Sequence, residues 1–93
     1  MRRIVILGGG VTGLALGYLR NRCPAPGDDV LILEEGPSPG GTVRTIREEG
    51  LVLEAGPVTL RTTPASDRLV EALGLEDDVL VADPRSPRWI VRG

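Results

Sequence analysis

The sequence contains no lysine, histidine, glutamine or phenylalanine, and it contains a single cysteine. The absence of histidine removes the imidazole base and the imidazole metal ligand, and it excludes a Ser-His-Asp triad. The absence of lysine excludes a Schiff base with a substrate. A lone cysteine, Cys23, excludes an internal disulfide and a multi-cysteine zinc site. We therefore predict no catalytic side chain and no metal site in this chain, so any redox chemistry must come from a bound cofactor.

Net positive charge and long apolar runs are also lacking. The 11 basic and 13 acidic residues give a net charge of −2, so no basic surplus points to nucleic acid or to an anionic membrane. The apolar run at residues 4–7 is too short for the core of an export signal, and a membrane span needs about 20 apolar residues. We expect a cytoplasmic protein, in which any peripheral membrane contact is made by regions outside this chain.

What the sequence does contain is the composition of a globular protein. Of its 93 residues, 41% are hydrophobic and 26% are charged, a balance that is not typical of disordered or collagen-like chains. Residues 2–7 are a β-branched run, residues 13–22 favour a helix, residues 23–29 form a loop rich in proline and glycine, and residues 30–33 are a second apolar run. The order strand, helix, strand predicts a βαβ unit of the usual length of about 30 residues. The continuous apolar runs favour strands in a parallel sheet.

The remaining elements are predicted to be short. They are a turn at 48–50, a helix that begins at Pro64, and extended segments at 42–47, 51–53, 79–81 and 89–91, the last of which is entered from Arg88. Thr63 can cap the helix, proline fits its first position, and Gly74 is a natural stop. Two parallel strands with bare edges are a poor independent fold. We therefore interpret residues 1–93 as the N-terminal part of a larger domain, the remainder of which is absent from this chain.

The turn between the first strand and the helix is Gly8-Gly9-Gly10-Val11-Thr12-Gly13, which matches the pattern G-x-G-x-x-G. The match follows a strand, opens a helix and precedes an acidic residue at the end of the next strand, which is the context of a dinucleotide site. Gly8 permits the tight turn, Gly10 lets the backbone approach a pyrophosphate, and Gly13 lets the helix sit close to the strand. The N–H groups at the helix start would meet the negative charge of the ligand. The sequence thus predicts an α/β protein with an incomplete Rossmann-like FAD/NAD(P)-binding βαβ unit, against the alternative of a plain turn.

Glu34 lies at the end of the second apolar run, 21 residues after Gly13. At this spacing its carboxylate would accept hydrogen bonds from the hydroxyl groups of the adenosine ribose, and it would repel the 2′-phosphate of NADP. The alternative is a solvated carboxylate at a strand end. The βαβ unit alone does not choose between NAD and FAD.

The next segment, from Glu35 through Gly40-Gly41-Thr42-Val43-Arg44-Thr45, resembles the second motif of the flavin amine oxidase superfamily, whose members use FAD. That motif is R-x-G-G-R followed by Thr or Ser. In this sequence Ser38 and Thr42 stand at the two arginine positions. Arg44, the only guanidinium nearby, could supply the usual contact of arginine with phosphate, and the alternative is that Arg44 is an exposed strand residue.

Within that superfamily the sequence resembles the protoporphyrinogen oxidase family over nearly its whole length. The similar stretches are IVILGGGVTGLALGYL, VLILEEGPSPGGTVRT, LVLEAGP and LVEALGLEDDVL, together with the segment from Pro84 to the end. The resemblance implies that the chain is the N-terminal part of an FAD-binding domain, without the substrate domain. It implies the following cofactor-binding residues: Gly8, Gly9, Gly10, Val11, Thr12, Gly13, Glu34, Glu35, Gly41, Thr42, Gly56, Pro57, Val58 and Thr59. The resemblance implies that Gly56-Pro57 lies beside the flavin ring, and the alternative is that these two residues form an ordinary turn.

The resemblance also implies an activity, in which FAD oxidises protoporphyrinogen IX or coproporphyrinogen III to the porphyrin in haem biosynthesis, with oxygen as the acceptor. The porphyrinogen and oxygen would be handled by the missing part of the protein, and a eukaryotic member would sit at the mitochondrial inner membrane. The isolated chain is expected to show no turnover and weak FAD affinity. Three alternatives stay open: a sister flavoenzyme such as an amine oxidase or carotenoid desaturase, an NAD-binding βαβ module, and a truncated reading frame without function.

Overall fold

The computed structural model describes residues 2–23, 25–87 and 89–92. The chain divides into two compact units, one up to Arg61 and one from Thr62 onward, and each is described by itself. Two residues for which the sequence makes a prediction, Pro24 in the loop and Arg88 before the last strand candidate, lie outside the described residues.

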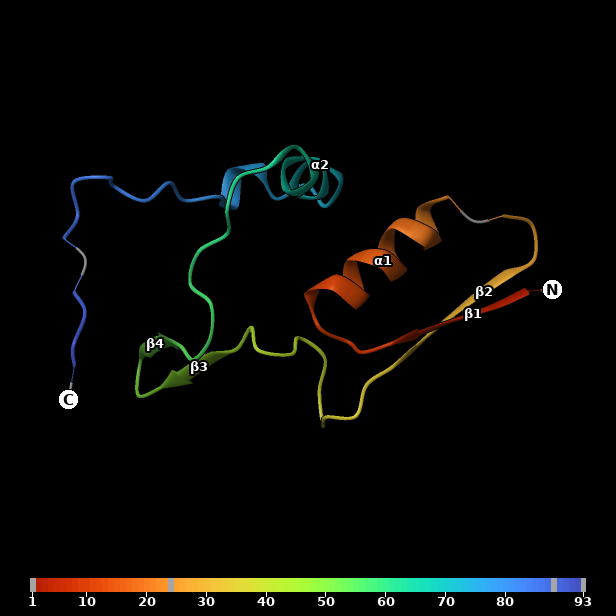
Figure 1. Ribbon diagram of the computed structural model, residues 1–93, viewed down its shortest axis with the longest axis horizontal. Helices are drawn as coiled ribbons and strands as arrows, with labels where there is room; N and C mark the ends of the chain where they lie inside the picture. Colours follow the sequence, from red (N-terminus) through yellow and green to blue (C-terminus); the bar gives the residue numbers. More distant parts are fainter. Residues whose placement is uncertain (1, 24, 88, 93) are drawn as a thin grey trace. The chain divides into compact units, whose positions relative to one another are not determined.

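The first unit begins with the predicted βαβ arrangement. Strand β1 (Arg2–Leu7) is followed by helix α1 (Val11–Arg22) and strand β2 (Asp28–Leu33). The two strands pair in parallel, in a register that runs from Arg2 opposite Asp28 to Leu7 opposite Leu33, and α1 lies along them (Figure 1). The parallel pair with its connecting helix confirms an α/β fold that contains part of a Rossmann-like unit.

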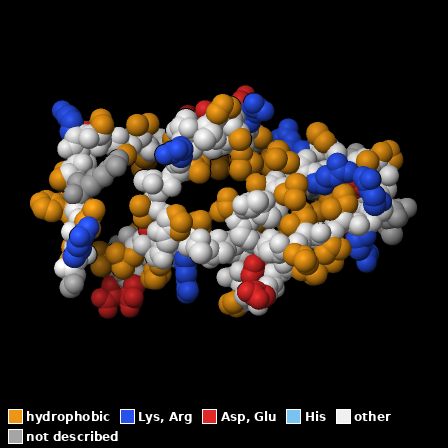
Figure 2. All heavy atoms as spheres, in the orientation of Figure 1, with side chains coloured by type: hydrophobic (Ala, Val, Ile, Leu, Met, Phe, Trp, Pro, Cys, Tyr) orange, Lys and Arg blue, Asp and Glu red, His pale blue; other side chains and the backbone are white. Residues whose placement is uncertain are grey.

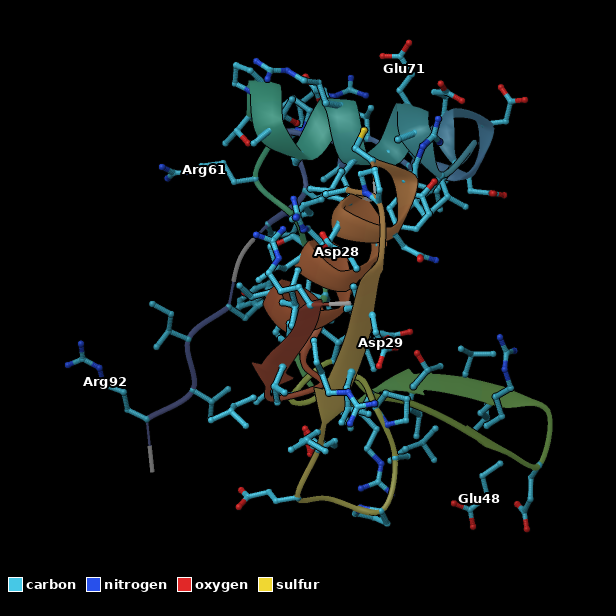
Figure 3. The ribbon with its side chains drawn as sticks, turned by 90° about the vertical axis from the view of Figure 1, so that its right-hand side faces the viewer. Asp28, Asp29, Glu48, Arg61, Glu71 and Arg92 are labelled. Carbon is cyan, nitrogen blue, oxygen red and sulfur yellow. The ribbon has the colours of Figure 1, made fainter. Side chains whose placement is uncertain are left out.

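Two boundaries differ from the prediction. Helix α1 begins at Val11 rather than residue 13, because Gly10 is its N-cap and its carbonyl accepts the Leu14 N–H at 2.9 Å. Strand β2 begins at Asp28 rather than residue 30. The Asp28 carboxylate, whose side chain is only 2% exposed, is held by the guanidinium groups of Arg2 on β1 and Arg20 on α1. This pair of contacts draws the end of the predicted loop into the sheet, where Figure 3 shows Asp28 and Asp29 on β2.

The core of this unit lies between α1 and one face of the strand pair. Ile6 is 7% exposed, and Gly17 of α1 is buried beside it. A Cβ at Gly17 would lie 2.7 Å from Ile32 Cδ1 and 3.6 Å from Ile6 Cδ1. The glycine inside the helix therefore allows the close approach of helix to strands that the sequence predicted.

The opposite face of the strand pair is open. Side chains alternate along a strand, so Val5, Leu7, Leu31 and Leu33 share the face that α1 does not cover, and they are 42% to 81% exposed. Figure 2 shows hydrophobic side chains at the surface in the region where Figure 1 places these strands. The strands are thus covered on one face only, whereas their continuous apolar sequence predicted cover on both.

The first unit ends in a hairpin of strands β3 (Thr45–Glu48) and β4 (Leu51–Glu54). The two residues of the tip, Glu49 and Gly50, have φ angles of +48° and +80°, which are typical of a type I′ turn. At the other end, Thr45 Oγ1 donates to the carboxylate of Glu54 at 2.9 and 3.0 Å. The predicted hairpin is confirmed, although β3 begins three residues later than expected because residues 40–43 form a turn.

The second unit contains helix α2 (Pro64–Ala72) and the short 3₁₀ helix η1 (Glu76–Asp78). Thr63 and Ser66 form a reciprocal capping box at the start of α2. Gly74, with φ +68°, ends it in a Schellman motif, in which Leu75 N–H donates to Val70 O and Gly74 N–H to Glu71 O. The predicted start and stop of this helix are both confirmed.

The two predicted strands at 79–81 and 89–91 are wrong within the part of the chain that the structure describes. Residues 79–81 and 89–91 are part of no strand, although the backbone of Val79 is extended, and Leu80 and Val81 are 93% and 92% exposed. A strand needs a neighbour for its backbone hydrogen bonds, and no neighbouring strand pairs with these residues. In the described ranges, no helix has the length and apolar character required to cross a membrane.

Candidate functional site

The glycine turn between β1 and α1 has the geometry that its sequence predicts. Gly8 adopts φ +102°, a conformation that side chains disfavour, and its N–H donates to Leu33 O at 2.7 Å. A Cβ at Gly10 would meet nothing within 4 Å, so the space above this residue is open to a ligand. A Cβ at Gly13 would lie 1.9 Å from Gly8 O, so only glycine fits the close contact between the first turn of the helix and the end of the strand.

The N-terminus of α1 is available to an anion. Its N-cap, Gly10, offers no side-chain hydrogen bond, and the first turn contains no acidic residue. Val11 and Thr12 are exposed. The first N–H groups of a helix have no partner within the helix, and they carry the positive end of its dipole. The turn and the helix start together therefore form a cradle that fits a phosphate group.

Glu34 closes one side of this cradle. Its Oε1 accepts the N–H of Gly9 at 2.9 Å, and its Oε2 accepts the N–H of Gly36 at 2.8 Å. The hydrogen bonds from Gly36 and Gly9 lower the pKa of Glu34, because they stabilise the ionised carboxylate. Each carboxylate oxygen has a second lone pair, so Glu34 can still accept hydrogen bonds from ribose hydroxyls. The adjacent Glu35 is exposed on the turn that follows β2.

The second glycine motif lies directly against the first. Gly40 N–H donates to Gly9 O at 2.8 Å, and Gly10 and Gly40 form a parallel bridge. Gly41 has φ +61°, and a Cβ there would lie 3.2 Å from Gly10 Cα. Sequence reasoning placed Gly41 at the site but missed Gly40, which makes the hydrogen bond. The signal for it was the doubled glycine, since two successive residues without side chains suit a contact between two backbones.

The root of the hairpin meets this second turn. A Cβ at Gly56 would lie 1.8 Å from Thr42 O and 2.9 Å from Thr42 C, and Ala55 N–H donates to Arg44 O at 2.8 Å. The structure thus brings together Thr42 and Gly56, two residues that the sequence assigned to the site separately.

The last predicted site residues follow the hairpin. Pro57, Val58 and Thr59 form an exposed segment without regular secondary structure, and Val58 is 72% exposed. Arg44 is also exposed. Their role in cofactor binding stays a prediction, as it does for the other residues of the site.

Comparison with known proteins agrees with the Rossmann-like fold. The family model described as an NAD(P)-binding Rossmann-like domain matches residues 6–73. The chain is 38% identical over 84 residues to the protoporphyrinogen oxidase of Bos taurus, which covers 85% of this chain and 17% of the relative. It is 38% identical over 78 residues to the coproporphyrinogen III oxidase of Propionibacterium freudenreichii subsp. freudenreichii, covering 83% of this chain and 14% of the relative.

A solved structure is similar as well. The crystal structure described as "Putative protoporphyrinogen oxidase" from Exiguobacterium sp. 255-15 superposes with a TM-score of 0.64 at 40% identity, covering 82% of this chain and 17% of that one. The resemblance drawn from the sequence motifs is thereby confirmed, and the relatives are named as oxidases. The chain spans about one-sixth of the length of these relatives.

Proposed function

Because the chain belongs to the family of NAD(P)-binding Rossmann-like domains, we propose that its glycine turn and Glu34 bind the ADP half of FAD. The whole protein would then be a flavin-dependent oxidase of a porphyrinogen. The observation that carries this proposal is the convergence of two glycine motifs and one carboxylate: Gly9 bonds both to Glu34, through its N–H, and to Gly40, through its carbonyl.

Each part of the cradle has a distinct task. The open space at Gly10 admits the pyrophosphate to the backbone, and the helix N-terminus supplies N–H donors and the positive end of the dipole. The Glu34 carboxylate accepts hydrogen bonds from the ribose hydroxyls, and its negative charge disfavours a 2′-phosphate, which argues against NADP.

FAD supplies the redox chemistry when it is bound, because its ring accepts hydride equivalents. The residues of this chain hold it: the turn at 40–42 and the segment 56–59 form the side of the site where the flavin half is expected. The absence of histidine and lysine is compatible with this division of labour, because hydride transfer to a flavin needs no nucleophile from the protein.

The porphyrinogen and the acceptor belong to the whole protein. The names of the relatives support protoporphyrinogen and coproporphyrinogen as the two candidate substrates. We propose oxygen as the electron acceptor. We place the protein in the cytoplasm. Residues beyond this chain would bind the substrate, and they would make any contact with a membrane surface.

An NAD-binding module is the second candidate, and the description of the family model favours it. The two functions are separated by titrating the purified chain with FAD and with NAD, following flavin fluorescence for the first and calorimetry for the second. We expect FAD to bind, although weakly, and NAD to bind at least about ten-fold more weakly. Gly10→Val should abolish FAD binding because it fills the open space, whereas Gly74→Asn, just beyond the C-terminus of α2, should leave it unchanged.

The activity needs a longer protein. The gene, expressed with any reading frame that continues it, should give a yellow protein whose flavin absorption is bleached by a porphyrinogen without oxygen and returns with air. A colourless product that binds NAD would refute the flavin assignment. A yellow protein that an amine or a carotenoid bleaches, but a porphyrinogen does not, would refute the substrate assignment alone.

A further inference from the structure

The two glycine motifs and the hairpin root form three successive layers of backbone. The first layer is Gly9–Gly10, the second is the turn at 40–42, and the third is Gly56. Between the first and second layers lie the Gly40–Gly9 hydrogen bond and the 3.2 Å approach of a Gly41 Cβ to Gly10 Cα. Between the second and third lies Thr42 O, which occupies the place of a Cβ at Gly56. No side chain separates these layers at their points of contact.

Gly56 cannot carry a side chain because Thr42 lies where its Cβ would be. The reason differs from that at Gly50, on the tip of the same hairpin, where the φ of +80° favours glycine although a Cβ would meet nothing within 4 Å. At Gly56 the obstructing atoms are backbone atoms of Thr42, at 1.8 and 2.9 Å, and they cannot move aside as the end of a flexible side chain would. Any larger residue at this position must displace the second turn.

We infer that Gly56 is a positioning residue: its bare Cα receives the Thr42 carbonyl and so holds the turn at 40–42 in place for the flavin half of the cofactor. This inference rests on the proposed function. We expect the ADP half not to depend on Gly56. Gly8 is held by Leu33 of β2, and Gly13 packs against Gly8 and against Ile6 of β1. Glu34 is held by the N–H groups of Gly9 and Gly36. A change at Gly56 should therefore discriminate between FAD and ADP.

The first test needs no ligand. Hydrogen exchange is compared in the full chain, in Gly56→Ala and in the control Gly50→Asn, which alters the other end of the same hairpin. In Gly56→Ala, the amides of Gly40, Val43 and Ala55 should exchange about ten-fold faster, because they bond within and beside the second turn. The amides of Gly8 and Leu14, which bond within the βαβ unit, should keep their rates, and the control should change none of the five.

The second test compares affinities for FAD and ADP. Gly56→Ala should weaken FAD binding about ten-fold and change ADP binding less than about two-fold, whereas Gly50→Asn should change neither. Unchanged exchange at Gly40 and Val43 would overturn the inference. So would a loss of protection at Gly8 and Leu14 as well, because Gly56 would then be a general packing residue.

The proposed function can fail separately. If the parent chain binds neither FAD nor ADP while the exchange pattern is as expected, the cofactor assignment is wrong but the positioning of the second turn by Gly56 holds. If the parent binds FAD and Gly56→Ala binds it equally well, the cofactor assignment stands and the positioning role is refuted.

Discussion

A single residue, Glu34, joins the glycine turn to the turn that follows β2. One of its oxygens holds the glycine turn through Gly9, and the other holds the start of the next turn through Gly36. Both donors are backbone N–H groups, which favour the ionised carboxylate and lower its pKa below the ordinary value of 4.5. Ionised Glu34 is thus part of the cradle, and protonation of its carboxylate would weaken the hydrogen bonds from Gly9 and Gly36.

The depressed pKa of Glu34 predicts a dependence on pH. A carboxyl group whose pKa is lower in the folded state stabilises that state above its unfolded-state pKa, and this contribution is lost as the pH falls through the folded-state value. The amide of Gly9 should therefore keep its protection from exchange near neutral pH and lose it as the pH drops below 4.5. The substitution Glu34→Gln replaces the carboxylate with an uncharged amide, so it should flatten this dependence.

The control for this prediction is the difference between the two proteins at each pH. Asp28 also has a lowered pKa, first through its hydrogen bond with Arg2, and it titrates in both proteins. Subtracting the two profiles leaves the part due to Glu34. Identical profiles in the parent and in Glu34→Gln would show that the carboxylate does not hold Gly9 in solution.

Helix α1 contains two glycines, Gly13 and Gly17, whose missing Cβ atoms would meet different obstacles. At Gly13 the obstacle to a Cβ is the carbonyl oxygen of Gly8, 1.9 Å away, which is backbone. At Gly17 the nearest atom is the Cδ1 of Ile32, 2.7 Å away, which is the end of a side chain that can change rotamer. The two positions are on the same helix, but only at Gly13 is the obstacle a backbone atom that cannot move aside.

This contrast predicts a large loss of stability for one alanine substitution and a small change for the other. Gly13→Ala should destabilise the βαβ unit by about 2 kcal/mol or more, as expected for overpacking that backbone cannot relieve. Gly17→Ala should change stability by less than about 1 kcal/mol, because the gain of about 1 kcal/mol in helix propensity offsets the shift of Ile32. Hydrogen-exchange free energies of the β1 amides measure the stability change in each variant. Equal changes in the two variants would contradict the conclusion that only Gly13 is blocked by backbone.

The whole molecule has little apolar surface hidden from water. Ile6 is the one buried hydrophobic side chain in the part of the chain that the structure describes, while Leu7, Leu80, Ile90 and Val91 are more than 80% exposed. Burial of apolar surface supplies most of the stability of a domain and most of its heat-capacity change on unfolding. The chain also spans about one-sixth of the length of its relatives.

The exposed apolar surface predicts a weak thermal transition for the chain by itself. Typical domains show a heat-capacity change of about 12–15 cal/mol/K per residue on unfolding, and this chain should show less than about half of that. Calorimetry of the 93-residue protein gives the value directly. An ordinary heat-capacity change would mean that the open face of β1 and β2 is covered in solution, for which sedimentation would then test self-association.

The sequence by itself determined the features that depend on near neighbours along the chain. These are the glycine turn, the βαβ order, the hairpin with a turn predicted at 48–50, and both ends of α2, because a positive φ or a cap is decided by a few adjacent residues.

The tertiary structure decided everything that requires a partner from a distant segment. It paired Gly40 with Gly9, set Thr42 against Gly56, and drew Asp28 into β2 through Arg2 and Arg20. It also left the apolar segments at 79–81 and 89–91 outside any strand. Apolar, β-branched residues favour a strand, but a strand forms only where another backbone lies beside it to share its hydrogen bonds.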